Sequence, residues 1–344
     1  MLARLNIPGA WMWSAWQPDH GMNFNSYVFE RGDGCVAVDP LPLDPSTMDA
    51  IAALGGVHTV VITNEDHVRG TAALRKRFDA RVIEAVNDGE EVFPGAYAIH
   101  IPHGKSEEFA LHLPAAKAAV VGDAFIGAPA GSLSLFAQDK LQNPRLLPFA
   151  LRRLWALQLD ALLLCDGQPI FSGADEAIGA LLEAHAGPEI YRINVNDLRY
   201  VNDPEPALYA AEDAEIGLLI GARKLGYRLA KIPPGKAFCP MHWHVGSEEF
   251  FYVVEGTPSL RMRSGMLQCK PGDFIAFPTG ERGAHQLRND SSEPVLVLLV
   301  GIEEQALGME ACFYPDSDKV GLWTTRERLR MVRSSPDLDY YDGE

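Results

Sequence analysis

The sequence predicts two domains of different fold class, an α/β domain followed by an all-β domain. Between residues 23 and 188, runs typical of strands alternate with runs typical of helices, which indicates a layered α/β domain. From about residue 189, short runs of Val, Phe, Tyr and Leu alternate with Gly/Pro turns, as in a sandwich or barrel. A length of 344 residues also suits two domains. We expect domains at 1–188 and 189–335, with the second core at about 215–315, and a tail at 336–344.

The elements of the α/β domain follow from local patterns. Residues 27–38 contain two apolar runs separated by Gly32-Asp33-Gly34, which predicts a hairpin. Apolar, β-branched runs predict further strands, and helix-forming runs with apolar residues one turn apart predict helices. We expect strands at 59–63, 81–85, 118–121 and 161–165, and helices at 68–78, 146–157 and 173–185.

Composition excludes several classes of partner. The formal net charge is −16, and no long run of Lys and Arg is present, so nucleic acid and anionic membrane surfaces are not expected partners. No apolar run reaches the length of a membrane span, and the N-terminus lacks the continuous apolar core of a signal peptide. The five cysteines are scattered, which predicts a reducing cytoplasmic location.

A group of histidines in the second domain predicts a metal site. His242 and His244 are two residues apart, so on a strand both imidazoles face the same side. Glu249 opens the next apolar strand, and His285 follows the turn at 278–280. Three imidazoles and a carboxylate suit one divalent metal, Fe, Mn, Ni, Cu or Zn, and leave positions for a small-molecule ligand or substrate.

These residues lie in two passages that resemble the paired motifs of the cupin superfamily. The passages are PPGKAFCPMHWHVGSEEFFYVVEG at 233–256 and KPGDFIAFPTGERGAHQLRN at 270–289. Their loops are one and two residues longer than the family pattern. The resemblance implies a double-stranded β-helix, or jelly-roll, barrel with the metal on His242, His244, Glu249 and His285. The family spacing favours Glu249 over its neighbour Glu248. Cupin barrels often pair through edge strands, so we expect a homo-oligomer, in the simplest case a dimer.

Strand alternation nominates residues near this metal. If Glu249 and His285 face inward, Phe251 and Leu287 face the same way and either line an apolar pocket or belong to the barrel core. Cys239 precedes the first ligand strand and either lines the barrel mouth or acts as a small buried hydrophobe.

The first domain resembles the metallo-β-lactamase fold, an αββα sandwich. The resemblance rests on the segments NSYVFERGDGCVAVDP, VVITNEDHVRG, IPHGKSEEFALHL, VVGDAFIG and LLLCDGQPIF. Two of the family's metal-binding histidines are replaced by Ile62 and Asn64, and Asp166 replaces a third. A second metal could still be held by some of a reduced set, namely Asp66, His67, His103, Asp123 and Asp166. The alternative is a degenerate scaffold domain in which Asp66 and His67 cap the next helix.

Three hypotheses about function follow. The first is a cupin metalloenzyme of the dioxygenase, isomerase or decarboxylase type, acting on a small molecule. The second is a non-catalytic module that binds a small molecule or a metal, with the first domain as a scaffold. The third is a single-metal hydrolase that acts from the first domain.

Overall fold

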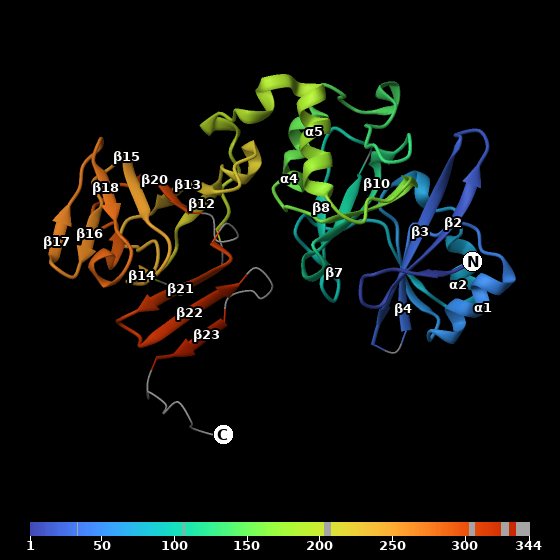
Figure 1. The fold of residues 1–344 in the computed structure, drawn as a ribbon, viewed down its shortest axis with the longest axis horizontal. Helices are drawn as coiled ribbons and strands as arrows, with labels where there is room; N and C mark the ends of the chain where they lie inside the picture. Colours follow the sequence, from blue (N-terminus) through green and yellow to red (C-terminus); the bar gives the residue numbers. More distant parts are fainter. Residues whose placement is uncertain (33, 106, 203–207, 303–306, 325–329, 335–344) are drawn as a thin grey trace. The chain divides into compact units, whose positions relative to one another are not determined.

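The chain folds into two compact units in a computed structural model that describes residues 1–32, 34–105, 107–202, 208–302, 307–324 and 330–334 (Figure 1). The units are Met1–Ile190 and Tyr191–Glu344. The sequence-based boundary after residue 188 lies within a 3₁₀ helix at Gly187–Tyr191.

The first unit is built on one mixed sheet of 11 strands. Its strand order is β6-β5-β4-β3-β11-β10-β9-β8-β7, and β2 pairs with both β1 and β3. The strands are β1 (Ala3–Arg4), β2 (Ala10–Gln17), β3 (Met22–Arg31), β4 (Gly34–Val38), β5 (Val57–Val61), β6 (Arg81–Ile83), β7 (Glu91–Phe93), β8 (Ala96–His100), β9 (Phe109–Leu113), β10 (Ala118–Gly127) and β11 (Ala161–Gly167). The helices are α1 (Pro45–Ala53), α2 (Thr71–Phe78), α3 (Leu147–Ala150), α4 (Arg152–Trp155) and α5 (Ala174–Ala186).

Three hydrophobic clusters give this unit the predicted four-layer order. One cluster joins residues of β3 and β4, such as Phe29, to residues of β9 to β11, so the two halves of the sheet pack face to face. A second packs the other face of β4 and β5 against α1 and α2 through Ile51 and Leu74. A third packs β10 and β11 against α3, α4 and α5, with Trp155 and Ile178 among its members. Helices therefore cover both outer faces, as expected for an αββα sandwich.

Several predicted element boundaries were wrong. The single helix expected at 146–157 is two short helices, α3 and α4, separated by Leu151. The strand expected at 118–121 continues as β10 to Gly127 and carries Asp123 inside it, because this end of β10 pairs with β11 after a register shift. The helix expected from residue 68 begins at Thr71, since a separate 3₁₀ turn at Glu65–His67 precedes it.

The second unit consists of short strands in three sheets. Their orders are β12-β13-β20-β15-β18, β17-β16-β19 and β14-β21-β22-β23. The strands are β12 (Glu212–Glu215), β13 (Leu225–Ile232), β14 (Trp243–His244), β15 (Glu249–Glu255), β16 (Ser259–Met262), β17 (Gly265–Gln268), β18 (Phe274–Phe277), β19 (His285–Arg288), β20 (Val295–Ile302), β21 (Met309–Tyr314), β22 (Lys319–Thr324) and β23 (Arg330–Arg333).

One core fills the space between these sheets. Phe251, Val253 and Val297 from the five-stranded sheet pack with Leu260 and Leu287 from the three-stranded sheet. The all-β class predicted for this part of the chain is therefore confirmed, with the jelly-roll packing of two sheets around one core.

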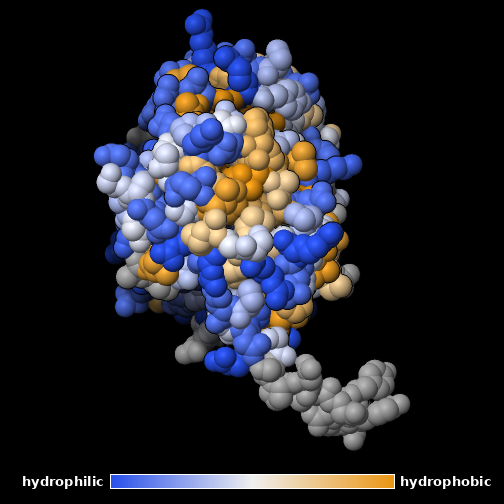
Figure 2. Space-filling view, turned by 90° about the vertical axis from the view of Figure 1, so that its left-hand side faces the viewer, coloured by the Kyte–Doolittle hydropathy of each residue, from blue (hydrophilic) through white to orange (hydrophobic). Residues whose placement is uncertain are grey.

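The outer surface of the second unit carries apolar side chains, which Figure 2 shows gathered on one face. Exposed members in this unit include Met266, Leu267 and Phe274, whose side chain is 73% exposed. No helix in the described part of the chain is long and apolar enough to cross a membrane.

Candidate metal centre

Four of the predicted ligands converge inside the second unit. The Nε2 atoms of His242, His244 and His285 lie 3.6, 3.4 and 3.3 Å from Oε2 of Glu249. His242 and His285 face each other across two strands, because each donates its backbone N–H to the other's carbonyl oxygen. Glu248, the competing carboxylate, is exposed and does not join this group.

The second ring nitrogen of two histidines is held by backbone oxygen atoms. Nδ1 of His242 lies 2.9 Å from the carbonyl oxygen of Pro240, and Nδ1 of His285 lies 2.9 Å from that of Gly283. A carbonyl oxygen only accepts, so Nδ1 carries a proton and Nε2 is the nitrogen available to a metal. These contacts therefore fix the tautomer that can bind a metal through Nε2.

A buried carboxylate lies close to the third histidine. Nδ1 of His244 lies 3.6 Å from Oε1 of Glu310, whose side chain is only 1% exposed. The same carboxylate accepts hydrogen bonds from the backbone N–H groups of Val245 and Gly246. A Cβ atom at Gly246 would lie 2.7 Å from Oε2 of Glu310, so a glycine allows this close approach. Glu310 thus ties the loop after the histidines to strand β21.

The four donor atoms have the spacing that a single metal requires. Two ligand atoms that are each about 2.1 Å from one metal, at angles of about 90–110°, lie roughly 3.0–3.4 Å apart. The observed separations from Glu249 fall close to this range. In addition, Oε2 of Glu249 and Nε2 of His285 are buried without a well-formed hydrogen bond. Buried polar atoms rarely remain unpaired, so the donor set fits a divalent cation.

Burial, repulsion between imidazoles and attraction to Glu249 set the protonation of this group. Burial would lower the pKa of His242, but Cys239 and Glu249 outweigh it and raise the pKa well above its ordinary value. Burial would raise the pKa of Glu249, but the three imidazoles outweigh it and lower the pKa to about 2. Burial, together with His242, lowers the pKa of His285 to about 4. The pKa of His244 is lowered as well, chiefly by burial. Near neutral pH Glu249 is therefore ionised and His285 is neutral, the forms that bind a metal.

Aromatic rings fix the position of His285. The ring of Phe277 stacks on it with centroids 3.7 Å apart, and the ring of Phe251 meets it edge-on at 5.3 Å. Phe251 and Leu287 are 2% and 0% exposed and belong to the barrel core. Leu287 therefore belongs to the barrel core and not to a pocket lining. Phe251 also belongs to the core, and its ring contacts a candidate ligand. Cys239 is half-buried, with Sγ 3.5 Å from Nδ1 of His242.

Strand β21 supplies residues that sequence reasoning missed. Glu310, Cys312 and Tyr314 alternate along it. Glu310 lies beside His244, Cys312 is the cross-strand partner of His244, and the ring of Tyr314 stacks near that of His242. The spacing of two residues between them was the available signal. It was overlooked because none of the three lies in the histidine motifs.

A second polar cluster lies in the first unit, around His67. Nδ1 of His67 lies 2.9 Å from Oδ2 of Asp39, and its Nε2 lies 2.9 Å from Oδ1 of Asp123. The contact with Asp39 is bent away from ideal hydrogen-bond geometry, but its length and full burial still make it an ion pair. Burial would lower the pKa of His67, but the two carboxylates raise it to about 10. The ring is therefore a buried cation with both nitrogens engaged.

Asp39 was quoted in the sequence but not given a role. It ends β4 in a left-handed conformation, with φ of 49°. Its carboxylate accepts hydrogen bonds from the backbone and the hydroxyl of Thr63, and from Sγ of Cys165 at 3.1 Å. These contacts and His67 lower the pKa of Asp39 despite its complete burial. The Val-Asp-Pro end of a buried strand was the signal for this residue.

Protein cations also pair with the remaining carboxylates of the first unit. Nζ of Lys105 forms an ion pair with Asp66 and lies 3.5 Å from Oδ2 of Asp123. Arg69 lies 3.8 Å from Asp166. Burial and the nearby Asp123 raise the pKa of Asp166 to about 6.

Two expectations for this unit concern His103 and the start of α2. His103 sits in a loop with φ of 71° and joins none of the groups of three potential ligands found among the described residues. Neither Asp66 nor His67 caps α2, whose N-cap is Gly70 without a side-chain bond. Asn64 instead caps the preceding 3₁₀ turn through the backbone N–H of Asp66.

Comparisons with known families identify both units. A model described as the metallo-beta-lactamase superfamily matches residues 2–184, which is more than half of the chain. The chain belongs to the metallo-β-lactamase superfamily. A second model, described as a cupin domain, matches residues 228–301. The chain thus joins a metallo-β-lactamase domain to a cupin domain, and no curated protein matches it.

Solved structures resemble one unit each. A cupin sugar phosphate isomerase from Silicibacter pomeroyi is 23% identical, covering 44% of this chain and 98% of its own, with a TM-score of 0.39. A sugar phosphate isomerase structure from Acidithiobacillus ferrooxidans is 25% identical over 44% of this chain and 98% of its own, with a TM-score of 0.38. A metallo-beta-lactamase from Pontibacter korlensis is 15% identical over 53% of this chain and 98% of its own, with a TM-score of 0.45.

The metallo-β-lactamase domain does not fit the metal ions of its superfamily. His67, Asp123 and Asp166 offer donor atoms within 4.8 Å of one another, as do Asp39, His67 and Cys165. Both groups depend on His67, whose two nitrogens already face carboxylates and so offer no free lone pair. Lys105 supplies a further positive charge beside Asp123. Protein cations thus pair with the carboxylates of this cluster, although Oδ1 of Asp166, 3.8 Å from Arg69, is buried without a hydrogen-bond partner.

Proposed function

We propose that the cupin domain binds one divalent metal on His242, His244, Glu249 and His285 and uses it on a small molecule. The observation that supports this most is the convergence of three Nε2 lone pairs on a buried, ionised carboxylate that has no Lys or Arg partner among the described residues. Burying the ionised Glu249 is costly unless a cation lies beside it. A metal ion of the Fe, Mn, Ni, Cu or Zn class would balance this charge in place of a proton on the imidazoles.

The reaction class follows from the donor set. Nitrogen and oxygen donors hold first-row metals that, when bound, polarise an oxygen-bearing substrate or activate dioxygen. The chain's own residues surround the ligands: backbone oxygen atoms hold two imidazoles, Glu310 lies beside the third, and Phe277 packs against His285. We therefore propose an enzyme of the dioxygenase, isomerase or decarboxylase type. Turnover would distinguish it from a module that only binds a ligand.

We further propose that the metallo-β-lactamase domain holds no metal and serves as a scaffold. The internal ion pairs of His67 with Asp39 and Asp123, and of Lys105 with Asp66, support this reading. Because cupin barrels often pair through their edge strands, we also propose that the chain forms a dimer through strands of its second unit.

Metal content of the full-length chain tests both statements. We expect one equivalent per chain in protein purified without a metal-binding tag, and none in the His242→Ala/His244→Ala variant. The Asp66→Ala variant is the matched control, because Asp66 is 57% exposed and its loss should leave the metal content unchanged. Metal that persists in the histidine variant and disappears from Asp66→Ala would overturn the assignment in favour of the first unit. Metal absent from wild type would remove the enzyme proposal.

A further inference from the structure

Strand β21 lies beside the metal centre but outside the part of the chain that the cupin model matches. The match ends at residue 301, whereas β21 spans Met309–Tyr314. The strand pairs with β14 so that His244 is directly opposite Cys312. Directly opposed residues of an antiparallel pair project from the same face of the sheet. The side chain of Cys312 therefore projects on the same side as the imidazole of His244.

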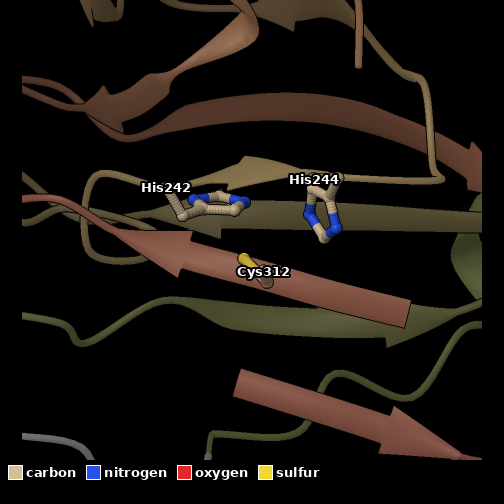
Figure 3. A group of neighbouring side chains, drawn as sticks. All are labelled: His242, His244 and Cys312. Carbon is tan, nitrogen blue, oxygen red and sulfur yellow. The ribbon is translucent and has the colours of Figure 1, made fainter. Parts of the chain in front are cut away.

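The thiol of Cys312 and two of the histidines form a potential ligand group. One ligand atom from each of His242, His244 and Cys312 lies within 4.8 Å of the others. Figure 3 shows the sulfur on its strand next to the strand that carries the two imidazoles, lying close to both rings. Cys312 is 1% exposed, so its sulfur faces the interior and not the solvent.

The neighbouring donor atoms point to a missing ligand independently of this thiol. Nε2 of His285, on a side chain that is 1% exposed, and Oε2 of Glu249 are buried without a hydrogen-bond partner. Glu249 and His285 form a group of potential ligands with His242, and Cys312 forms a second group with His242 and His244. The two groups share His242, so the cysteine lies next to a cluster with unpaired donor atoms.

We propose that Sγ of Cys312 is a fifth protein donor to the metal of the cupin domain. This inference rests on the proposed metal centre and deepens it. On binding, the S–H bond is replaced by an S–metal bond, and the proton is released to solvent. Thiolate is a soft ligand, so the site selects metals that accept sulfur, such as Zn, Fe, Co or Cu, over hard cations such as Mg or Ca.

Cys239 is the competing thiol, and its position argues against it. Its sulfur lies 3.5 Å from Nδ1 of His242, and this nitrogen is held at 2.9 Å by the carbonyl oxygen of Pro240. The nitrogen that faces Glu249 is Nε2, on the far side of the ring. Cys239 is thus placed behind the imidazole, whereas Cys312 is cross-strand from the second histidine ligand.

Cobalt substitution of the full-length protein tests this inference. Co(II) bound to nitrogen and oxygen gives weak visible bands, and a thiolate ligand adds a strong charge-transfer band in the near ultraviolet. We expect wild-type protein loaded with one equivalent of Co(II) to show both signals. The Cys312→Ser variant should keep the visible bands and lose the charge-transfer band, whereas the matched Cys239→Ser variant should keep both. Circular dichroism of each variant verifies that it is folded.

The outcomes separate this inference from the proposed function. Visible bands without a charge-transfer band in wild type would overturn the role of Cys312 and leave the metal centre intact. A charge-transfer band that survives Cys312→Ser, or that disappears in Cys239→Ser, would also overturn it. Absence of Co(II) binding in wild type would overturn the metal centre and with it this inference. The wild-type spectrum alone shows whether a thiolate binds the metal, so the test remains decisive even if a variant misfolds.

Discussion

The two units of this chain differ in how they neutralise buried carboxylates. In each, carboxylates and imidazoles are buried together. In the first unit the carboxylates are neutralised by the protein itself, through protonated His67, Lys105 and Arg69. In the second unit imidazoles surround Glu249, and backbone oxygen atoms hold Nδ1 of two of them, so that Nε2 of each faces the carboxylate. A donor cluster therefore indicates a metal only when its charge is not already balanced.

The largest effect on stability is expected at the centre of the first cluster. Replacing His67 with Ala leaves Asp39 and Asp123 as buried charges without their cation, which costs roughly 3–5 kcal/mol of unfolding free energy. Urea unfolding, with hydrogen exchange of residues 57–78 to report on this unit, measures the loss. His58→Ala is the control, because His58 lies on the exposed side of β5. A loss below about 1 kcal/mol, or a loss of bound metal, would contradict the description of this cluster as a metal-free ion network.

Removing the lysine of the same cluster should leave its carboxylates without a protein cation and so let them bind a metal ion. Lys105→Met leaves Asp66 and Asp123 without their ammonium partner and should cost about 1–3 kcal/mol. Zinc should then raise the melting temperature of the variant more than that of wild type. Lys140→Met is the matched control, since both lysines lie near the ring of Phe136 but only Lys105 contacts these carboxylates. Equal responses to zinc in the two variants would show that Lys105 does not exclude metal.

In the second unit, a carboxylate that does not touch the metal should still control its affinity. Glu310→Gln keeps the size of the side chain but weakens its hold on His244 and on the loop at Val245 and Gly246. We expect metal affinity to fall roughly 10–100-fold, measured by competition with a chelator. Glu248→Gln, at an exposed site, is the control. Unchanged affinity in Glu310→Gln would mean that the loop is ordered without this residue.

The smallest effect is the pH dependence of the first unit. The folded pKa of His67, about 10, lies above the ordinary value of 6.5, so its stabilisation is complete below about pH 6.5 and is lost as pH rises toward 10. Between pH 7.5 and 9.5 the unfolding free energy should fall by on the order of 1 kcal/mol per pH unit. This window lies above the raised pKa values of Glu108 and Asp166, about 7 and 6, whose contributions are lost earlier. A His67→Gln variant with the same slope as wild type would contradict this assignment.

Patterns in the sequence predicted much of the cupin domain because local spacing sufficed. His242 and His244 share a strand face, and Glu249 and His285 occupy the positions that the family spacing gives them. Local spacing predicted less of the first unit. Asp123 was placed after a strand but lies inside β10, and the role given to His103 from its motif position stays a prediction. Contacts such as that of Lys105 with Asp66 join residues far apart in sequence, and helix or strand periodicity cannot predict such contacts.

The sequence by itself determined the two fold classes and the candidate ligands of the second unit, since hydrophobic period, turn residues and motif spacing are local properties. Only the tertiary structure decided which carboxylates already have a cation. It showed His67 between Asp39 and Asp123, and it brought Glu310 and Cys312 of β21 beside His244. The physical reason is that charge balance depends on distance and burial. These are set by strand pairing between segments that the sequence keeps apart.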